Sequence, residues 1–154
     1  SLENVYEFLP KQLIHRDVHF GNFLFSEGEL SGYIDFDLSQ RNIRIFDICY
    51  FLTGLLAEEA EEAFTKKEWT ENVRAAIEGY ESITRLSAEE KAAIPWVMEC
   101  IEILFAAYFL GMEDFKHAKE AWEVFLFVQD GDKKDGQVRR GDMPAWGSDE
   151  WSGS

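Results

Sequence analysis

The sequence predicts an α+β fold in which a short β-rich start precedes a mainly helical remainder. Apolar runs separated by a Gly-containing polar turn, Ser26 to Glu29, are typical of a small β-hairpin. From residue 45 onward, apolar side chains recur every three or four positions, which is typical of amphipathic helices. With 154 residues, 46% of them hydrophobic, the chain is long enough to bury a core.

The expected strands are short and lie in the first third of the chain. Leu13 and Ile14 form a short strand or its end, and residues 22–25 and 30–34 form the two arms of the hairpin. The helical pattern begins at residues 45–56, and the sequence "AEEAEEA" extends that pattern into solvent. Residues 69–80 form a second expected helix.

Capping signals place the third and fourth helices. Ser87 and Glu90 match the capping box, so we expect a helix that begins there, bends or restarts at Pro95 and runs to Gly111. Asp114 is expected to cap the fourth helix. The side chains expected to face inward on that helix are Phe115, Ala118, Trp122, Phe125 and Leu126.

Composition divides the chain at about residue 130. Residues 1–130 carry the predicted strands and helices, whereas residues 131–154 contain repeated glycines and no sustained periodicity. We therefore expect residues 131–154 to be a flexible acidic tail that contains glycine and two tryptophans, Trp146 and Trp151.

The charge and the cysteines limit the partners and the location of the protein. The formal net charge of −15 repels phosphate backbones and anionic lipids, which argues against nucleic-acid and membrane partners. The most apolar stretch contains Glu99 and Glu102, so we expect a buried helix there rather than a membrane span. Cys49 and Cys100 lie in apolar helical patterns and are expected to be reduced. With no signal peptide in the first residues, a cytoplasmic protein is expected.

A polar cluster lies between the predicted strands. His15, Asp17 and Asn22 have the spacing His-x-Asp-x4-Asn, which arises by chance in roughly one chain per hundred of this length. Asp35 and Asp37 follow the hairpin, and on an extended strand they would point the same way, about 6.6 Å apart along the chain.

These residue types together suggest phosphoryl transfer. Two carboxylates held close together repel one another and need a cation. Mg²⁺ binds carboxylate and amide oxygens, which makes Asn22, Asp35 and Asp37 candidate metal ligands. Asp17 is then free to orient a hydroxyl or to accept its proton, while the metal binds phosphate.

Residues 13–56 resemble the catalytic and metal-binding segment of the aminoglycoside phosphotransferase and choline kinase superfamily. That superfamily includes the type II homoserine kinases and has a protein-kinase-like fold. "LIHRDVHFGN" is similar to the family's His-x-Asp-x-His-x-x-Asn loop, "GYIDFD" to its metal strand, and "RIFDICYFL" to the acidic helix start that follows. The helical remainder to about residue 130 agrees with the C-terminal lobe of that fold.

The resemblance implies roles for the individual residues. Asp17 would be the catalytic base or would orient the hydroxyl, and His15 would support the loop by bonding to backbone near the metal strand. Asn22 and Asp35 would hold the Mg²⁺ ions that bridge the phosphates of ATP. Asp47 would brace the catalytic loop from behind.

Three further acidic residues have open roles. Asp37 is a second metal ligand, a residue that supports the ligands, or merely an exposed acid. Glu99 and Glu102 share a helix face and could contact a cationic substrate, although ion pairs with Arg74 or Arg85 explain them equally well.

The features of a nucleotide-binding N-terminal lobe are missing from this sequence. No Gly-x-Gly-x-x-Gly occurs, and Lys11 is the only lysine ahead of the catalytic loop. We therefore expect a C-terminal lobe without that partner: a fragment, a half-enzyme completed by another chain, or a degenerate relative. Such a lobe should have little or no kinase activity alone, and its uncovered apolar surface favours self-association.

The acceptor and two alternative functions stay open. The resemblance allows an aminoglycoside, choline, homoserine or a sugar-like acceptor, and the acidic chain favours a cationic one. One alternative is a non-catalytic helical binding module that keeps this fold without binding ATP. The other is a metal-dependent hydrolase built on His15, His19, Asp35 and Asp37.

Overall fold

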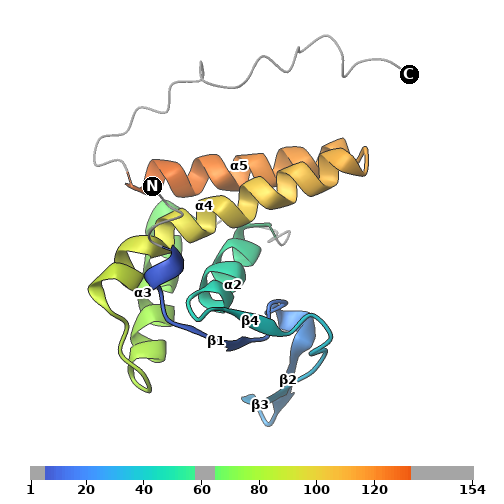
Figure 1. The fold of residues 1–154 in the computed structure, drawn as a ribbon. Coiled ribbons are helices and arrows are strands. Elements are labelled where there is room, and N and C mark those ends of the chain that lie inside the picture. The colour runs from blue at the N-terminus through green and yellow to red at the C-terminus, as the bar shows by residue number, and fades with distance from the viewer. Residues whose placement is uncertain (1–5, 58–64, 133–154) are drawn as a thin grey trace.

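The computed structural model describes residues 6–57 and 65–132 and has the expected α+β architecture. Short strands and a 3₁₀ turn occupy the first part of the chain, and helices form the rest (Figure 1). The strands are β1 (Lys11–Ile14), β2 (Phe23–Ser26), β3 (Glu29–Tyr33) and β4 (Gln40–Ile43), with the 3₁₀ turn η1 at Phe20–Asn22. The helices are α2 (Phe46–Ala57), α3 (Lys66–Glu81), α4 (Ala88–Gly111) and α5 (Phe115–Asp132).

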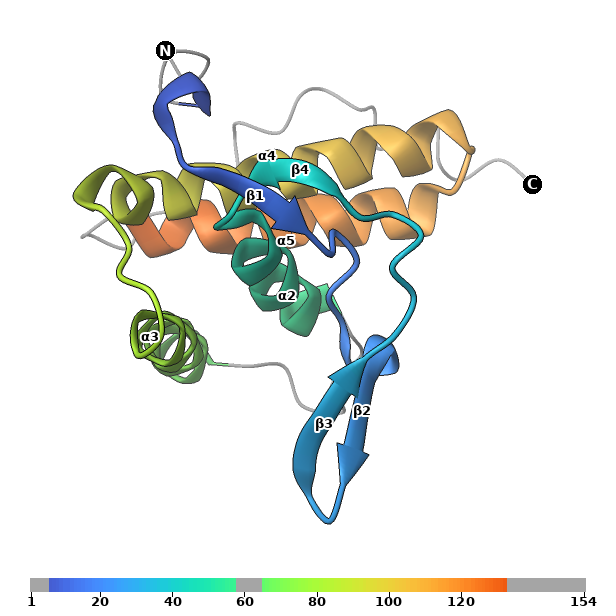
Figure 2. The ribbon, with the colours of Figure 1, turned by 60° about the horizontal axis from the view of Figure 1, so that its bottom comes forward.

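The predicted hairpin is present as β2 and β3. Their antiparallel register pairs Phe23 with Tyr33 and Ser26 with Glu29, which leaves a two-residue loop. Glu27 and Gly28 in that loop have φ angles of 53° and 84°, as a type I′ turn requires. The hairpin extends away from the helices (Figure 2). Asn22, expected at the start of the strand, instead ends η1.

Strand β4 has no counterpart in the sequence prediction, and it determines how the polar cluster is held. It pairs antiparallel with β1, so that Ile14 lies opposite Gln40. This pairing closes a loop of residues 15–39, which contains the hairpin together with Asp17, Asn22, Asp35 and Asp37. The two-stranded β1–β4 sheet is therefore the base from which both polar segments start.

Helix α2 lies at the centre of the molecule, and α4 and α5 run side by side behind it (Figures 1 and 2). Cys49 and Leu52 of α2 are fully buried against α4. The buried core consists of Leu9, Ile43, Ile45, Cys49, Leu52, Trp69, Leu86, Ala93, Ile94, Val97, Met98, Ile101, Val124 and Val128. This core holds the start of α2 rigidly beneath the β1–β4 sheet.

Helix α4 starts where predicted and continues through Pro95. Ser87 and Glu90 form both hydrogen bonds of a capping box. Pro95 lies inside one continuous helix, so of the two predicted alternatives the restart is wrong, and the bend stays a prediction. Packing of the following apolar turns onto the core outweighs the backbone bond that a helical proline lacks.

Helix α5 begins where predicted but turns a different face inward. The Asp114 carboxylate accepts a hydrogen bond from the backbone N–H of His117 (3.3 Å), as a capping residue does. The most buried side chains of α5 are Ala118, Ala121, Val124 and Val128. Phe115 is exposed, so the predicted large-residue face is wrong in part. Small residues form the buried face because they allow α5 to lie close to α4.

A buried ion pair joins the β-rich part to the helices. Arg44 follows β4, and its Nε and Nη2 donate to the two carboxylate oxygens of Glu90 at 2.6 and 2.7 Å. Glu90 has no exposed surface, and the same Nη2 also donates to the carbonyl of Arg85 (2.7 Å). The pair fixes the β4–α2 connection against the start of α4.

Helix α4 is, among the described helices, the one long and apolar enough to cross a membrane by length and composition. Core helices of soluble proteins pass the same test, so this observation is weak evidence of a span. Cys49 and Cys100 are both free thiols, in agreement with the expected reduced state. The run at 58–64 and the tail from residue 133 lie outside the described residues, and α5 extends past the predicted boundary at 130.

Candidate active site

Asp47, at the start of α2, holds the loop that follows β1. Its two carboxylate oxygens accept the backbone N–H groups of His15 and Arg16, each at 2.8 Å. Arg16 has a φ of 75°, a left-handed conformation that is strained for a residue with a long side chain. The bonds from Asp47 stabilise this turn, which directs the next residue, Asp17, back toward α2.

His15 links the loop to the end of the hairpin. Its Nε2 donates to the carbonyl of Ile34 (2.8 Å), and its Nδ1 accepts the backbone N–H of Asp17 (3.3 Å). These partners require the neutral tautomer with hydrogen on Nε2. The ring also packs against Phe36, with 4.6 Å between ring centroids.

Because both ring nitrogens of His15 are bonded to the protein, this residue cannot be a metal ligand. Within residues 6–57 and 65–132, no group of three or more His, Cys, Asp or Glu side chains could hold a metal ion. The geometry therefore gives no support to a hydrolase built on His15, His19, Asp35 and Asp37.

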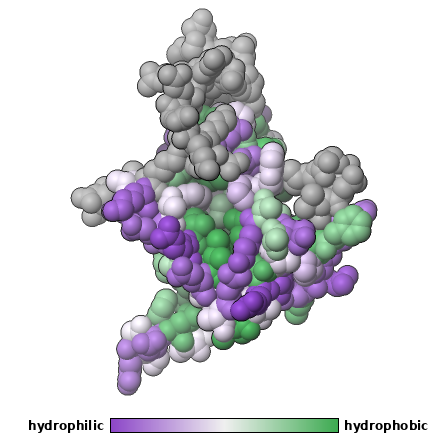
Figure 3. Space-filling view, turned by 90° about the vertical axis from the view of Figure 1, so that its left-hand side faces the viewer, coloured by the Kyte–Doolittle hydropathy of each residue, from purple (hydrophilic) through white to green (hydrophobic). Residues whose placement is uncertain are grey.

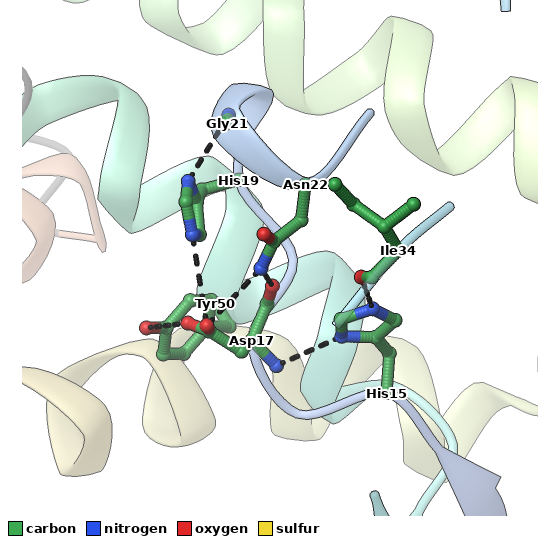
Figure 4. A network of polar contacts seen from close by, with 7 residues as sticks. All are labelled: His15, Asp17, His19, Gly21, Asn22, Ile34 and Tyr50. Atoms are coloured by element: carbon green, nitrogen blue, oxygen red, sulfur yellow. Dashed lines mark hydrogen bonds and ion pairs between the residues drawn. The ribbon is translucent and has the colours of Figure 1, made fainter. Parts of the chain in front are cut away.

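Asp17 and Asn22 are in direct contact (Figure 4). The amide nitrogen of Asn22 donates to the carbonyl of Asp17 at 2.9 Å and to its carboxylate Oδ2 at 3.1 Å. Asn22 is buried, and these two bonds orient its amide so that the oxygen takes no part in them. A neutral oxygen thus remains available beside the Asp17 carboxylate.

Two more side chains reach Asp17, from α2 and from the loop (Figure 4). The hydroxyl of Tyr50 donates to Oδ1 at 2.9 Å, and Nε2 of His19 lies 3.6 Å from Oδ2. Burial and the hydrogen bond to Asp17 raise the pKa of Tyr50 far above its ordinary value, so its hydroxyl remains a donor.

Glycine at position 21 leaves room for the His19 ring over the 3₁₀ turn η1. The Gly21 backbone N–H donates to Nδ1 of His19 (3.1 Å). A Cβ at Gly21 would lie 2.7 Å from Cε1 of His19, which is too close for a real contact. Glycine therefore lets the His19 ring fold over the turn and point its Nε2 at Asp17.

Asp35 and Asp37 lie just after β3 on exposed backbone. The backbone N–H of Ile34 donates to the carbonyl of Asn22 (3.0 Å), and the carbonyl of Ile34 accepts a hydrogen bond from His15. His15 and Asn22, which both bond to Asp17, therefore also hold Ile34, the residue that precedes Asp35. Neither carboxylate forms an ion pair with a described residue.

The predicted geometry of Asp35 and Asp37 is wrong. Strand β3 ends at Tyr33, and Asp35 has a φ of 62°, outside the extended region. Asp37 lies in a turn that the backbone bond from Ser39 to Phe36 closes (3.0 Å). The two side chains are therefore not consecutive same-side positions of one strand.

A cavity of about 270 Å³ is bordered by Tyr50 and His19, the two side chains that reach Asp17, although Asp17 itself does not line it. It is lined by His19, Tyr50, Gly54, Ala57, Glu102, Phe105, Phe109, His117, Glu120 and Ala121. Glu102 thus lies at the cavity, whereas Glu99 is not among its lining residues. Glu102 is 3% exposed, and burial raises its pKa to about 7, against a smaller opposing effect of a hydrogen bond with Thr53.

Glu102 forms no ion pair with Arg74 or Arg85, or with any other cationic side chain that the structure describes. The ion-pair explanation considered for this residue is therefore wrong. Tyr50, Gly21 and the cavity were not predicted from the sequence. Tyr50 follows Asp47 by three residues on α2, a helical spacing that puts both on one face and could have identified it.

Comparison with known proteins identifies the family. A family model described as "Phosphotransferase enzyme family" matches residues 3–91, which is more than half of the chain and contains the whole polar cluster. The chain belongs to this phosphotransferase family. The family resemblance noted from the sequence motifs is thereby confirmed.

Curated relatives of this phosphotransferase-family chain carry the name homoserine kinase. The protein of Neisseria meningitidis serogroup B is 33% identical over 131 residues, which are 83% of this chain and 39% of that protein. That of Phenylobacterium zucineum is 37% identical over 87 residues (56% of the chain, 25% of the relative), and that of Gluconobacter oxydans 33% over 98 residues (63% and 29%). The chain thus spans only 25–39% of the length of these relatives.

Proposed function

We propose that this chain is the C-terminal catalytic lobe of an ATP- and Mg²⁺-dependent phosphotransferase that phosphorylates a hydroxyl group of a small molecule. The observation that carries the proposal is the contact between Asp17 and Asn22 in the loop of residues 15–39, which also contains Asp35. The homoserine kinase relatives support a hydroxyl acceptor, because their name denotes one.

In this proposal Asp17 is the catalytic residue. Tyr50 and Asn22 each donate to one of its carboxylate oxygens, which fixes the direction of the carboxylate. An acceptor hydroxyl in the adjacent cavity donates its hydrogen bond to this carboxylate, which orients the oxygen for attack and receives its proton. His15 and Asp47 position the backbone on either side of Asp17.

The oxygen donors after the loop suit Mg²⁺. The amide oxygen of Asn22 is not used by the bonds that orient it, and Asp35 is an exposed carboxylate without an ion pair among the described residues. Hard oxygen donors of this kind fit a hard divalent cation. Mg²⁺ bound to ATP would neutralise charge on the transferred phosphate. Asp37 is proposed as an accessory ligand, because it lies two residues further along the same exposed segment.

The chain alone is proposed to have little or no kinase activity. It covers at most 39% of the relatives described above, and nucleotide binding in a kinase-like fold needs a phosphate-gripping loop of the kind that its sequence lacks. The proposed location is the cytoplasm, and neither nucleic acid nor membrane is a proposed partner, given the net charge of −15.

Asp17→Asn tests the proposed reaction in a longer polypeptide that contains this segment and transfers phosphate. The substitution keeps the side chain's size but removes the carboxylate, so the rate of ATP-dependent phosphorylation should fall by about 10²–10⁴. Glu71→Gln, on the surface of α3, also removes a carboxylate and is the control: its side chain is 59% exposed and does not line the cavity, so the rate should stay within a few-fold. A full rate in Asp17→Asn would contradict the proposal, as would steady ATP turnover by the 154 residues alone that Asp17→Ala abolishes.

A non-catalytic binding module is the second candidate, because an intact loop does not by itself require ATP binding. Magnesium titration separates the two. In a phosphotransferase, NMR signals of residues near Asp35 should shift with millimolar Mg²⁺ in the presence of ATP, and Asp35→Asn should remove the shift. Chemical shifts that stay unchanged on addition of Mg²⁺, both with and without nucleotide, would favour the non-catalytic binding module.

A further inference from the structure

The carboxylate of Glu102 is buried at the cavity near Asp17, and none of the described lysines and arginines forms an ion pair with it. It projects from the middle of α4 and lines the cavity together with Tyr50 and His19, both of which contact Asp17. The second carboxylate of the cavity, Glu120, has a partner of its own, since Lys116 lies 3.7 Å away. Glu102 is thus the carboxylate at this cavity that a ligand could neutralise.

A buried, unpaired carboxylate opposes folding, because the charged form loses its hydration. Of the described residues, Thr53 is the one whose hydrogen bond favours the ionised form of Glu102. Glu90 is a buried carboxylate with a cationic partner. It has no exposed surface, and its two oxygens accept hydrogen bonds from Arg44. The contrast points to a missing positive partner at Glu102, which a bound ligand would supply.

The walls of the cavity suit an ammonium group. Phe105, Phe109 and Tyr50 present aromatic rings beside the carboxylate, and aromatic faces attract cations. Its volume of about 270 Å³ is below the range of roughly 300–1,000 Å³ that drug-sized ligands occupy. The cavity therefore has the size to enclose a compact molecule.

We propose that Glu102 binds the ammonium group of a compact amino alcohol or hydroxy amino acid, whose hydroxyl then lies toward Asp17. This inference rests on the proposed phosphotransferase function for its reaction, but the binding step needs neither ATP nor Mg²⁺. Glu102 is in this view the residue that determines acceptor specificity: it selects hydroxyl compounds with a positive charge and rejects neutral alcohols of the same size.

The test is a titration of the isolated chain with 3-amino-1-propanol and 1,3-propanediol, which differ in the charged group. Ring signals of Phe105 and Phe109 report binding by NMR without any nucleotide. The amine should bind at least about tenfold more tightly than the diol, since a charged hydrogen bond exceeds a neutral one by that much. Glu102→Gln should remove this preference by weakening amine binding about tenfold or more, with diol binding unchanged.

Glu99→Gln is the matched control. It removes one negative charge from the same helix, three residues away, at a side chain that does not line the cavity. It should leave the preference for the amine intact. Equal binding of amine and diol by the unsubstituted chain, no saturable amine binding, or an equal effect of Glu99→Gln and Glu102→Gln would each overturn the proposal.

L-Homoserine and 4-hydroxybutanoate form a second matched pair, which separates the two sources of the ammonium group. If L-homoserine binds more tightly than 3-amino-1-propanol, the ligand class is a hydroxy amino acid, and if it binds more weakly, the class is a plain amino alcohol. Either result supports the proposal only if Glu102→Gln weakens the binding of both amines. Because these titrations contain no ATP, amine binding that persists while phosphoryl transfer fails would refute the proposed function and leave this inference standing. Active transfer without amine preference would do the opposite.

Discussion

Glu102 is the residue at which function and stability conflict most clearly. It is 3% exposed, and burial raises its pKa from an ordinary value near 4.5 to about 7. The folded protein therefore holds a proton on Glu102 at pH values at which the unfolded chain has released it. By linkage, the free energy of unfolding falls as pH rises from about 4.5 to 7, and stays lower above that range.

We accordingly expect Glu102→Gln to stabilise the chain at pH 8. The neutral amide keeps a hydrogen-bonding group for Thr53 and removes the buried charge, so the free energy of unfolding should rise by about 1–3 kcal/mol. At pH 4 the two proteins should be nearly equal, because Glu102 is then protonated in both states. Urea unfolding at the two pH values measures this.

Other polar and ionisable side chains lie around Glu102, so a control is needed. His19 and His117 face the cavity from the loop and from α5, and Glu120, Tyr50 and Thr53 complete the groups around Glu102. Any pH dependence that remains in Glu102→Gln belongs to these other groups. A stability difference that is the same at pH 4 and pH 8 would show that burial does not shift the titration of Glu102.

Individual site residues differed in how far the sequence could identify them. Asp17 and Asn22 were identified because their spacing is fixed by one short loop, and local spacing is visible in a sequence. Tyr50 was not, because its contact with Asp17 spans 33 positions and depends on how α2 packs beneath the loop. The left-handed backbone of Asp35 was also missed, since no turn residue such as glycine marks it.

The ion pair between Arg44 and Glu90 joins the β-rich part to the helices. The hydrogen bond from Arg44 lowers the pKa of Glu90, outweighing the opposing effect of burial. The ion pair therefore stabilises the folded protein at pH values above the ordinary glutamate pKa. This stabilisation is lost as the pH falls through the lowered pKa of Glu90. Glu90 also completes the capping box of α4, so one carboxylate serves both contacts.

Removing Arg44 should be costly because it leaves Glu90 buried and unpaired. We expect Arg44→Ala to lower the free energy of unfolding by about 3–5 kcal/mol at pH 7. Lys91→Ala is the matched control: Lys91 pairs with Glu81 at 2.7 Å on the surface, with 47% of its side chain exposed, and should cost at most about 1 kcal/mol. Denaturant unfolding of both variants measures the difference. Similar losses of unfolding free energy would mean that the Arg44–Glu90 pair contributes no more stability than an exposed ion pair.

Elements were predictable from the sequence where their signals are local. The type I′ hairpin and the capping box of α4 each depend on a few adjacent residues. Strand β4 was missed because "QRNI" is polar and owes its conformation to pairing with β1, about 30 positions away. On α5 the predicted inner face was right for Ala118 and wrong for Phe115, and the remaining buried positions are alanine and valines, which allow close packing against α4.

At the scale of the whole molecule, much apolar surface is exposed. Figure 3 shows one face on which a hydrophobic hollow is surrounded by hydrophilic side chains. The hairpin region is another exposed apolar surface. Its exposed large apolar side chains are Phe20, Leu24, Phe25, Leu30, Tyr33, Ile34, Phe36 and Leu38. Both strands of this two-stranded sheet also have an unpaired edge, so the hairpin offers apolar contacts together with backbone hydrogen bonds.

We therefore expect the isolated chain to self-associate through the hairpin. Sedimentation velocity over a range of concentrations should show a monomer at low concentration and larger species above it. Leu24→Ser and Phe25→Ser together should shift the association to higher concentration, because they remove apolar surface that only association can bury. The net charge of −15 opposes association, so added salt should favour it by screening the repulsion.

Ile83→Ser provides the control for this last expectation. Ile83 is 87% exposed in the connection between α3 and α4, so its replacement removes a comparable apolar side chain from a different surface. It should leave the concentration dependence nearly unchanged. If Ile83→Ser weakens association as much as the hairpin substitutions do, the chains associate non-specifically through any exposed apolar surface and not through the hairpin. If the unsubstituted chain is monomeric at every concentration, the hairpin is too polar at its edges, or too short, to form a stable interface.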